Sequence, residues 1–185
     1  MPGELGESVL LERIRMRDPA AFRQVYERYR LGLYRYCSMA LSGDDAAEDA
    51  VHETFLKLMR NPPVCDSNHG LRAWLYRVAR NEAAALRRGR RRLVNVDTDE
   101  IAHEETPLSA LAAAETTALV QRGLASIRPQ YREVLLLREF GELSYAEIAQ
   151  ITDSTVSAVK SEIFRARKAL AGVLQPIVRT ERDRS

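Results

Sequence analysis

The stretch "LSYAEIAQITDSTVSAVKSEIFRARKAL", residues 143–170, predicts two short helices joined by a polar turn. Ser144 and Glu147 fit a capping box, in which the serine oxygen accepts a backbone N–H and the glutamate reaches back to another. Residues 152–154 supply the turn, and Thr155 is expected to cap the second helix. The cap, a small alanine in the first helix, the turn and a basic second helix together predict a helix-turn-helix.

The second of these helices is expected to be amphipathic. Its apolar residues recur at intervals of three and four and should be buried: Val159, Ile163, Ala166 and Leu170. The opposite face carries lysine and arginine. A helix of this size fits the DNA major groove, where its first residues reach base edges and its cations bind phosphates. The alternative is a solvated helix at the end of a bundle.

The first half of the chain predicts three long helices. Asp18-Pro19 starts the first, whose apolar residues at 22, 25, 26, 29, 33, 36, 37 and 40 form one stripe. Cys37 lies on that stripe, which favours a buried structural thiol. Asp44 starts the second helix, and the third follows a loop over residues 61–70. Three long helices with short connections predict one helical domain.

Charge is distributed unevenly along the chain, although the net charge is only +2. Residues 71–93 hold eight arginines and one acid, whereas residues 94–117 hold six acids and no lysine or arginine. The basic block is a candidate polyanion site, and the acidic segment is typical of a linker. We therefore predict an all-α protein with domains at residues 1–93 and 118–185 and a linker at residues 94–117.

Several classes of protein are excluded by what the sequence lacks. No apolar run reaches the roughly 20 residues of a membrane span, and no signal peptide is recognisable, so we expect a cytoplasmic protein. The two cysteines and three histidines have no metal-ligand spacing, and no metal or cofactor is expected. Paired carboxylates, a nucleophile constellation and a glycine-rich phosphate loop are also missing, so the chain is not expected to be an enzyme.

The motifs resemble those of one known family. "AFRQVYERYRLGLYRYC", "AEDAVHETFLKLMR" and "LRAWLYRVARNEAAALRRGRRR" are similar to domain two of the extracytoplasmic-function sigma factors, group four of the sigma-70 family. "LASIRPQYREVLLLREF" and the helix-turn-helix are similar to domain four. The resemblance implies an alternative sigma factor that binds core RNA polymerase and directs promoter-specific initiation. It also implies an anti-sigma factor as a partner.

The resemblance assigns roles to particular residues. Those matching the contact with the polymerase beta-prime coiled coil are Asp49, His52, Glu53, Phe55 and Leu56. Those matching the part that opens and binds the −10 element are Asn61, Asn68, Arg72, Trp74, Arg77, Arg80, Asn81, Arg87 and Arg88. Those matching the −35 reader, in the domain that binds the beta flap, are Ser144, Thr155, Ser157, Lys160, Ser161, Glu162, Phe164, Arg165 and Lys168.

Some roles stay open. Trp74 either stacks on an unpaired base or belongs to the core, as its spacing to Val78 indicates. Glu162 departs from the family pattern and either accepts from a cytosine or is a surface charge beside Arg165. The other functions considered are a decoy that sequesters an anti-sigma factor and a dimeric helix-turn-helix repressor. The basic blocks argue against the decoy, and the first domain argues against the repressor.

Overall fold

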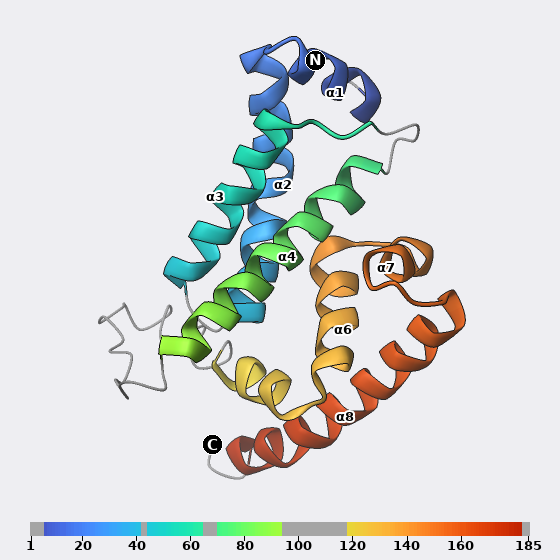
Figure 1. Cartoon of the computed structure of the whole chain (residues 1–185). Coiled ribbons are helices and arrows are strands. Elements are labelled where there is room, and N and C mark those ends of the chain that lie inside the picture. Colours follow the sequence, from blue (N-terminus) through green and yellow to red (C-terminus); the bar gives the residue numbers. More distant parts are fainter. Residues whose placement is uncertain (1–5, 42–43, 65–69, 94–117, 183–185) are drawn as a thin grey trace.

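A computed structural model describes residues 6–41, 44–64, 70–93 and 118–182, and within these residues every regular element is a helix (Figure 1). The predicted all-α class is confirmed. The N-terminal unit contains α1 (Glu7–Arg15), α2 (Pro19–Leu41), α3 (Asp44–Arg60) and α4 (Gly70–Leu93). The C-terminal unit contains a helix over residues 118–126, then α6 (Pro129–Gly141), α7 (Tyr145–Ile151) and α8 (Val156–Arg182).

The N-terminal unit is built around α2, which packs against α1, α3 and α4. Asp18 caps α2 by accepting from the Ala20 N–H at 2.8 Å, and it also accepts from Arg13 Nε at 2.6 Å. These hydrogen bonds, the backbone one foremost, lower the pKa of the Asp18 carboxyl. The expected stripe on α2 is buried except for Phe22, which is half-buried, and Tyr26, which remains 38% exposed at the edge of the stripe facing α3. The sequence pattern was wrong about Tyr26.

The predicted helix-turn-helix is confirmed in its details. Ser144 Oγ accepts from the Glu147 N–H at 3.2 Å, and the Ser144 N–H donates to Glu147 Oε2 at 2.7 Å, which completes the capping box. Thr155 Oγ1 accepts from the Ala158 N–H at 3.1 Å at the start of α8. Asp153 provides the turn with a positive φ of 52°, a conformation that short polar side chains tolerate.

Two neighbouring residues shape the end of α6. The helix ends at Gly141, and the left-handed residue that follows it is Glu142, with φ 50°. Glycine at position 141 permits close packing. A Cβ there would lie 3.0 Å from Leu143 Cγ and 3.3 Å from Tyr76 Cδ1.

The two units are packed against each other, with α6 lying beside α2 and α7 beside α4 (Figure 1). Tyr76 of α4 donates to the Phe140 carbonyl of α6 at 2.5 Å. Gly32 of α2 permits this approach, since a Cβ would lie 2.6 Å from Tyr76 Oη and 3.3 Å from Phe140 O. We call this arrangement the docked state. The sequence indicated only two domains and a linker.

Candidate functional site

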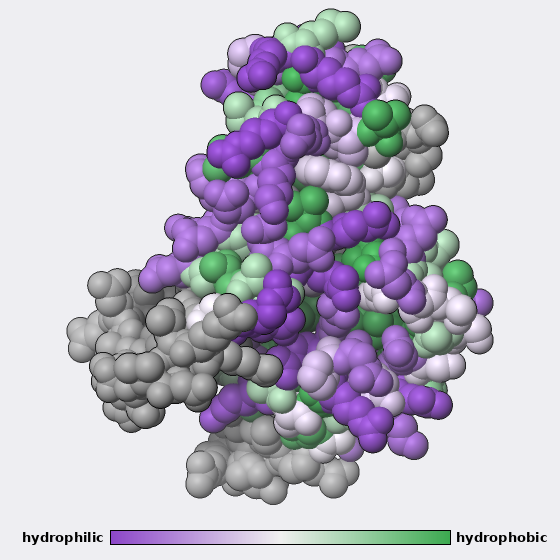
Figure 2. All heavy atoms as spheres, in the orientation of Figure 1, coloured by the Kyte–Doolittle hydropathy of each residue, from purple (hydrophilic) through white to green (hydrophobic). Residues whose placement is uncertain are grey.

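A groove with a volume of about 720 Å³ lies between α2 and α3. Its floor is apolar and includes Phe22 and Phe55, whose rings meet edge to face with centroids 6.1 Å apart. Leu31 and Met59 line it while remaining 53% and 48% exposed. In the view of Figure 2, hydrophilic residues cover most of the described surface, so large exposed apolar side chains stand out. Such a groove is suited to an amphipathic helix of a partner.

One edge of the groove is acidic. Glu48 and Asp49 line it and are exposed, and His52 lies one helical turn further along α3. On the opposite wall, Arg30 stands over the Tyr26 ring at 5.9 Å from its centroid and holds that ring in place. The groove therefore combines a preformed apolar floor with carboxylates that favour a basic partner.

The structure brings four of the five residues predicted for polymerase contact to this groove. Asp49, His52, Phe55 and Leu56 line it, whereas Glu53 is half-buried outside the lining. Phe55 is 3% exposed, so it forms the floor and does not project from the surface. Tyr26 and Leu31 also line the groove and were not predicted to do so. The spacing of Tyr26 placed it on the apolar stripe of α2, and Leu31 lies outside that stripe.

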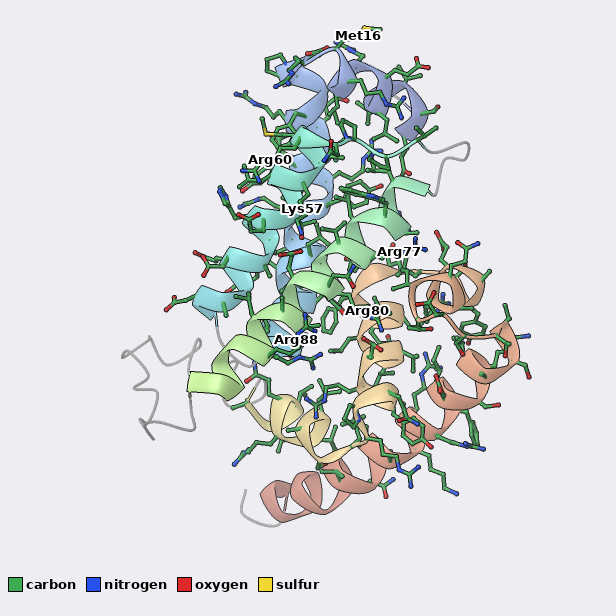
Figure 3. The ribbon with its side chains drawn as sticks, viewed as in Figure 1. Met16, Lys57, Arg60, Arg77, Arg80 and Arg88 are labelled. Atoms are coloured by element: carbon green, nitrogen blue, oxygen red, sulfur yellow. The ribbon has the colours of Figure 1, made fainter. Side chains whose placement is uncertain are left out.

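Three of the arginines predicted for the −10 element face the C-terminal unit. Arg80 Nε donates to Glu133 Oε1 at 2.6 Å, and another guanidinium nitrogen donates to the Ile151 carbonyl at 3.2 Å. Arg77 donates to the Gln150 carbonyl at 3.3 Å. Arg72 lies 3.8 Å from a Glu142 oxygen. Figure 3 shows Arg77 and Arg80 on the side of α4 that faces α6 and α7.

Glu133 was not predicted as a functional residue. Its hydrogen bond to Arg80 raises the pKa of that guanidinium, although partial burial opposes the shift. Both side chains are about a quarter exposed, so the pair is only partly screened by water. Nothing in the sequence around Glu133 distinguishes it from a surface acid of α6. Its role depends on a partner 53 residues away.

The other residues predicted for the −10 element are distributed differently. Four are exposed: Asn61, Asn81, Arg87 and Arg88. Trp74 is half-buried and packs against the hydrophobic core, as the spacing to Val78 indicated. Asn68 lies outside the described residues.

The residues predicted for the −35 element lie in or beside the helix-turn-helix. Seven of them are exposed along α8 or at its cap: Thr155, Ser157, Lys160, Ser161, Phe164, Arg165 and Lys168. Ser144 is exposed and caps α7. Phe164 is 70% exposed, an unusual position for a large apolar ring unless a partner covers it. Glu162 is half-buried, and among the described residues no ion pair joins it to Arg165.

Comparison with known proteins agrees with this geometry. The family description "Sigma-70 region 2" matches residues 25–93, and "Sigma-70, region 4" matches residues 117–170. The chain is 32% identical over 192 residues to the ECF RNA polymerase sigma-E factor of Escherichia coli (strain K12), covering 97% of this chain and all of that protein. It is 31% identical to the RNA polymerase sigma-H factor of Pseudomonas aeruginosa, covering 92% and 94% of the two chains.

Two solved structures have a similar fold. One is CnrH in complex with the cytosolic domain of CnrY, with a TM-score of 0.73, 24% identity and coverage of 92% of this chain and 97% of that one. The other is the sigma factor RpoE in complex with the anti-sigma factor NepR from Bartonella quintana, with a TM-score of 0.67, 26% identity and coverage of 83% and 96%. Within the described part of the chain, no helix is long and apolar enough to cross a membrane.

Proposed function

The chain belongs to the sigma-70 family, among its extracytoplasmic-function members, and from this premise we propose which of its surfaces meet each partner. It is an alternative sigma factor that binds core RNA polymerase and promoter DNA and directs transcription initiation. The assignments to residues below are our proposal. We also propose that it acts in the cytoplasm, where its polymerase and DNA are found.

The α2–α3 groove is the proposed docking site for the beta-prime coiled coil of core polymerase. The observation that carries this proposal is the combination of an apolar floor and an acidic edge in one preformed groove. A coiled-coil surface offers apolar side chains flanked by charged ones, which such a groove complements. Asp49 and His52 would contact the rim, and Leu56 the apolar part.

The basic face of α4 is the proposed contact for the −10 element. Arg72, Arg77 and Arg80 would bind the phosphates of the separated strand, while Arg87 and Arg88 extend the same helix. Arg77 and Arg80 now donate to groups of the C-terminal unit, and Arg72 forms an ion pair with Glu142. A guanidinium cannot give the same donors to a carboxylate and a phosphate, so promoter binding requires the docked state to open. We propose that binding to core polymerase supplies this opening.

The exposed face of α8 is the proposed reader of the −35 element. Ser157, Ser161 and Phe164 lie on the outer surface of a helix whose dimensions fit the major groove. Lys160, Arg165 and Lys168 would bind neighbouring phosphates. The beta flap of the polymerase would hold the same unit at the correct distance from the −10 contact.

An anti-sigma factor is the proposed inhibitory partner. The sigma factor RpoE, to which this chain is 26% identical, was solved in complex with the anti-sigma factor NepR. A segment of the inhibitor occupying the α2–α3 groove would exclude polymerase directly.

Footprinting and transcription with purified core polymerase test these proposals together. We expect protection of −35 and −10 sequences and specific transcripts only when both proteins are present. Tight, sequence-specific protection by the free protein would contradict the requirement for opening. Binding to an anti-sigma factor without any transcription would favour the decoy function instead.

A further inference from the structure

A second, smaller cavity lies between the two units, where the later part of α4 meets the start of α6. Its volume is about 310 Å³. Arg80 and Arg87 line it from α4, and Arg132 and Glu133 line it from α6. Its charged lining is therefore three guanidinium groups and one carboxylate, contributed by both units.

The charge in this cavity is not balanced. Glu133 already accepts from Arg80 at 2.6 Å and 3.4 Å. Arg132 donates through one terminal nitrogen to the Ala125 carbonyl at 3.0 Å, but its Nε is buried and has no hydrogen-bond partner in the described structure. Arg87 likewise forms no ion pair with any described residue. Among the residues that the structure describes, two cations of the cavity thus remain without an anion.

The surroundings of Arg132 agree with this imbalance. Burial, and then the nearby Arg87, lower the pKa of the Arg132 guanidinium. The N-terminus of α6 adds positive potential, since Pro129 is its first residue and Arg128 provides no side-chain cap. The first turn of α6 contains no acidic residue to offset the dipole. Two guanidinium groups that line one cavity beside a helix N-terminus form a setting that favours a bound anion.

We propose that this cavity binds a small phosphate-bearing anion, a diphosphate group held between Arg87 and Arg132. Guanidinium groups bind phosphate oxygens through paired hydrogen bonds, which suits two arginines facing one cavity. The volume admits a diphosphate but no nucleic-acid duplex. The anion is either inorganic diphosphate or the phosphate end of a nucleotide whose base extends past the exposed Arg87.

The position of the site gives it a regulatory consequence. Because Arg87 belongs to α4 and Arg132 to α6, the anion contacts both only in the docked state. A ligand that binds one state alone shifts the equilibrium towards that state. Diphosphate should therefore favour the docked state and oppose promoter contact by α4. This consequence rests on the proposed function, whereas binding of the anion does not.

Calorimetric titration of the full chain with inorganic diphosphate, at constant ionic strength, tests the site. We expect saturable binding that weakens at least about tenfold in Arg87→Gln and in Arg132→Gln, as loss of a charged hydrogen-bond donor predicts. Arg122→Gln removes an exposed arginine outside the cavity and should leave the affinity unchanged. ATP is titrated in parallel. Tighter binding of ATP assigns the nucleotide source, and equal or weaker binding assigns free diphosphate.

Gly32→Leu provides a test without any change of charge. The added side chain belongs to no residue that lines the cavity, but it meets Tyr76 Oη and the Phe140 carbonyl and so should hold the units apart. We expect diphosphate affinity to fall in this variant while circular dichroism remains helical. The proposal is overturned by unsaturable binding, by equal weakening in Arg122→Gln, or by full affinity in a Gly32→Leu protein shown to be open. Failure of the sigma-factor assignments would appear separately, as absent transcription by the native protein with core polymerase.

Discussion

Replacing Glu133 by glutamine should open the docked state. The carboxylate accepts from Arg80 at 2.6 Å and 3.4 Å, and both side chains are about a quarter exposed. A hydrogen bond between charged groups contributes about 1.5–3 kcal/mol, less where water screens it. Glutamine keeps one acceptor oxygen and loses the charge. We therefore expect a loss of about 1.5 kcal/mol from the docked state, which is about a tenfold shift towards the open form.

Fluorescence energy transfer between the two units measures this shift. Gln24 on α2 and Gln175 on α8 are exposed and accept dye-labelled cysteines. Cys65 is replaced by serine, while Cys37 is buried and will not react with the dyes. In Glu133→Gln, the efficiency of energy transfer should change towards the value expected when the two units are separated. Binding of the free protein to a single-stranded −10 oligonucleotide should rise in parallel, since Arg80 becomes available.

Glu139→Gln is the matched control for this experiment. Glu139 is also a glutamate of α6, and it accepts from Arg167 at 2.8 Å, a pair that lies wholly within the C-terminal unit. Its removal should change neither energy transfer nor binding to the oligonucleotide. If Glu133→Gln behaves like this control, the Arg80–Glu133 pair does not hold the units together and the reasoning is refuted.

Four further predictions concern individual residues or pairs of residues. Reversing the charge of Asp49 and Glu53 to lysine should reduce recovery of core polymerase in pull-downs while circular dichroism stays unchanged, and normal recovery would place docking elsewhere. Arg88→Gln should weaken open-complex formation on all cognate promoters and reduce the salt slope by about one unit, whereas loss on one promoter alone would indicate base reading. Burial raises the pKa of the Cys37 thiol to about 12, so it is protonated at neutral pH and iodoacetamide should modify it only after unfolding; rapid modification of the folded protein would contradict this. Glu162→Ala should relax preference at one C·G pair of a −35 library if Glu162 accepts from cytosine, and a uniform effect would exclude that contact.

The helices and their ends were predictable because they depend on neighbouring residues. The capping box of Ser144 and Glu147 and the cap at Thr155 involve residues three apart, and both formed as expected. The stripe of α8 follows from the helical period alone, with Val159, Ile163 and Ala166 buried and Leu170 half-buried. Tyr26 was misplaced because the period identifies a face of the helix but does not show where that face stops being covered.

The docked state was not predictable on the same basis. It depends on contacts between residues 53 to 73 positions apart, such as Arg80 with Glu133 and Arg77 with Gln150. Three of these contacts end on backbone carbonyls, which leave no signature in side-chain identity. A run of arginines predicts affinity for oxygen ligands, but it does not distinguish a phosphate from a carbonyl or a carboxylate of the same chain.

This dual use of α4 sets a limit on how stable the docked state can be. The apparent affinity for promoter DNA equals the affinity of the open form multiplied by the fraction of molecules that are open. Each tenfold stabilisation of the docked state therefore costs about 1.4 kcal/mol of DNA binding, unless polymerase supplies that energy by binding the open form more tightly. The α2–α3 groove is lined by residues of the N-terminal unit alone, and neither Arg77 nor Arg80 is among them. Polymerase can consequently bind there before the units separate. Arginines released at the polymerase surface then meet DNA at once, whereas in the free protein the same arginines remain bound to α6 and α7.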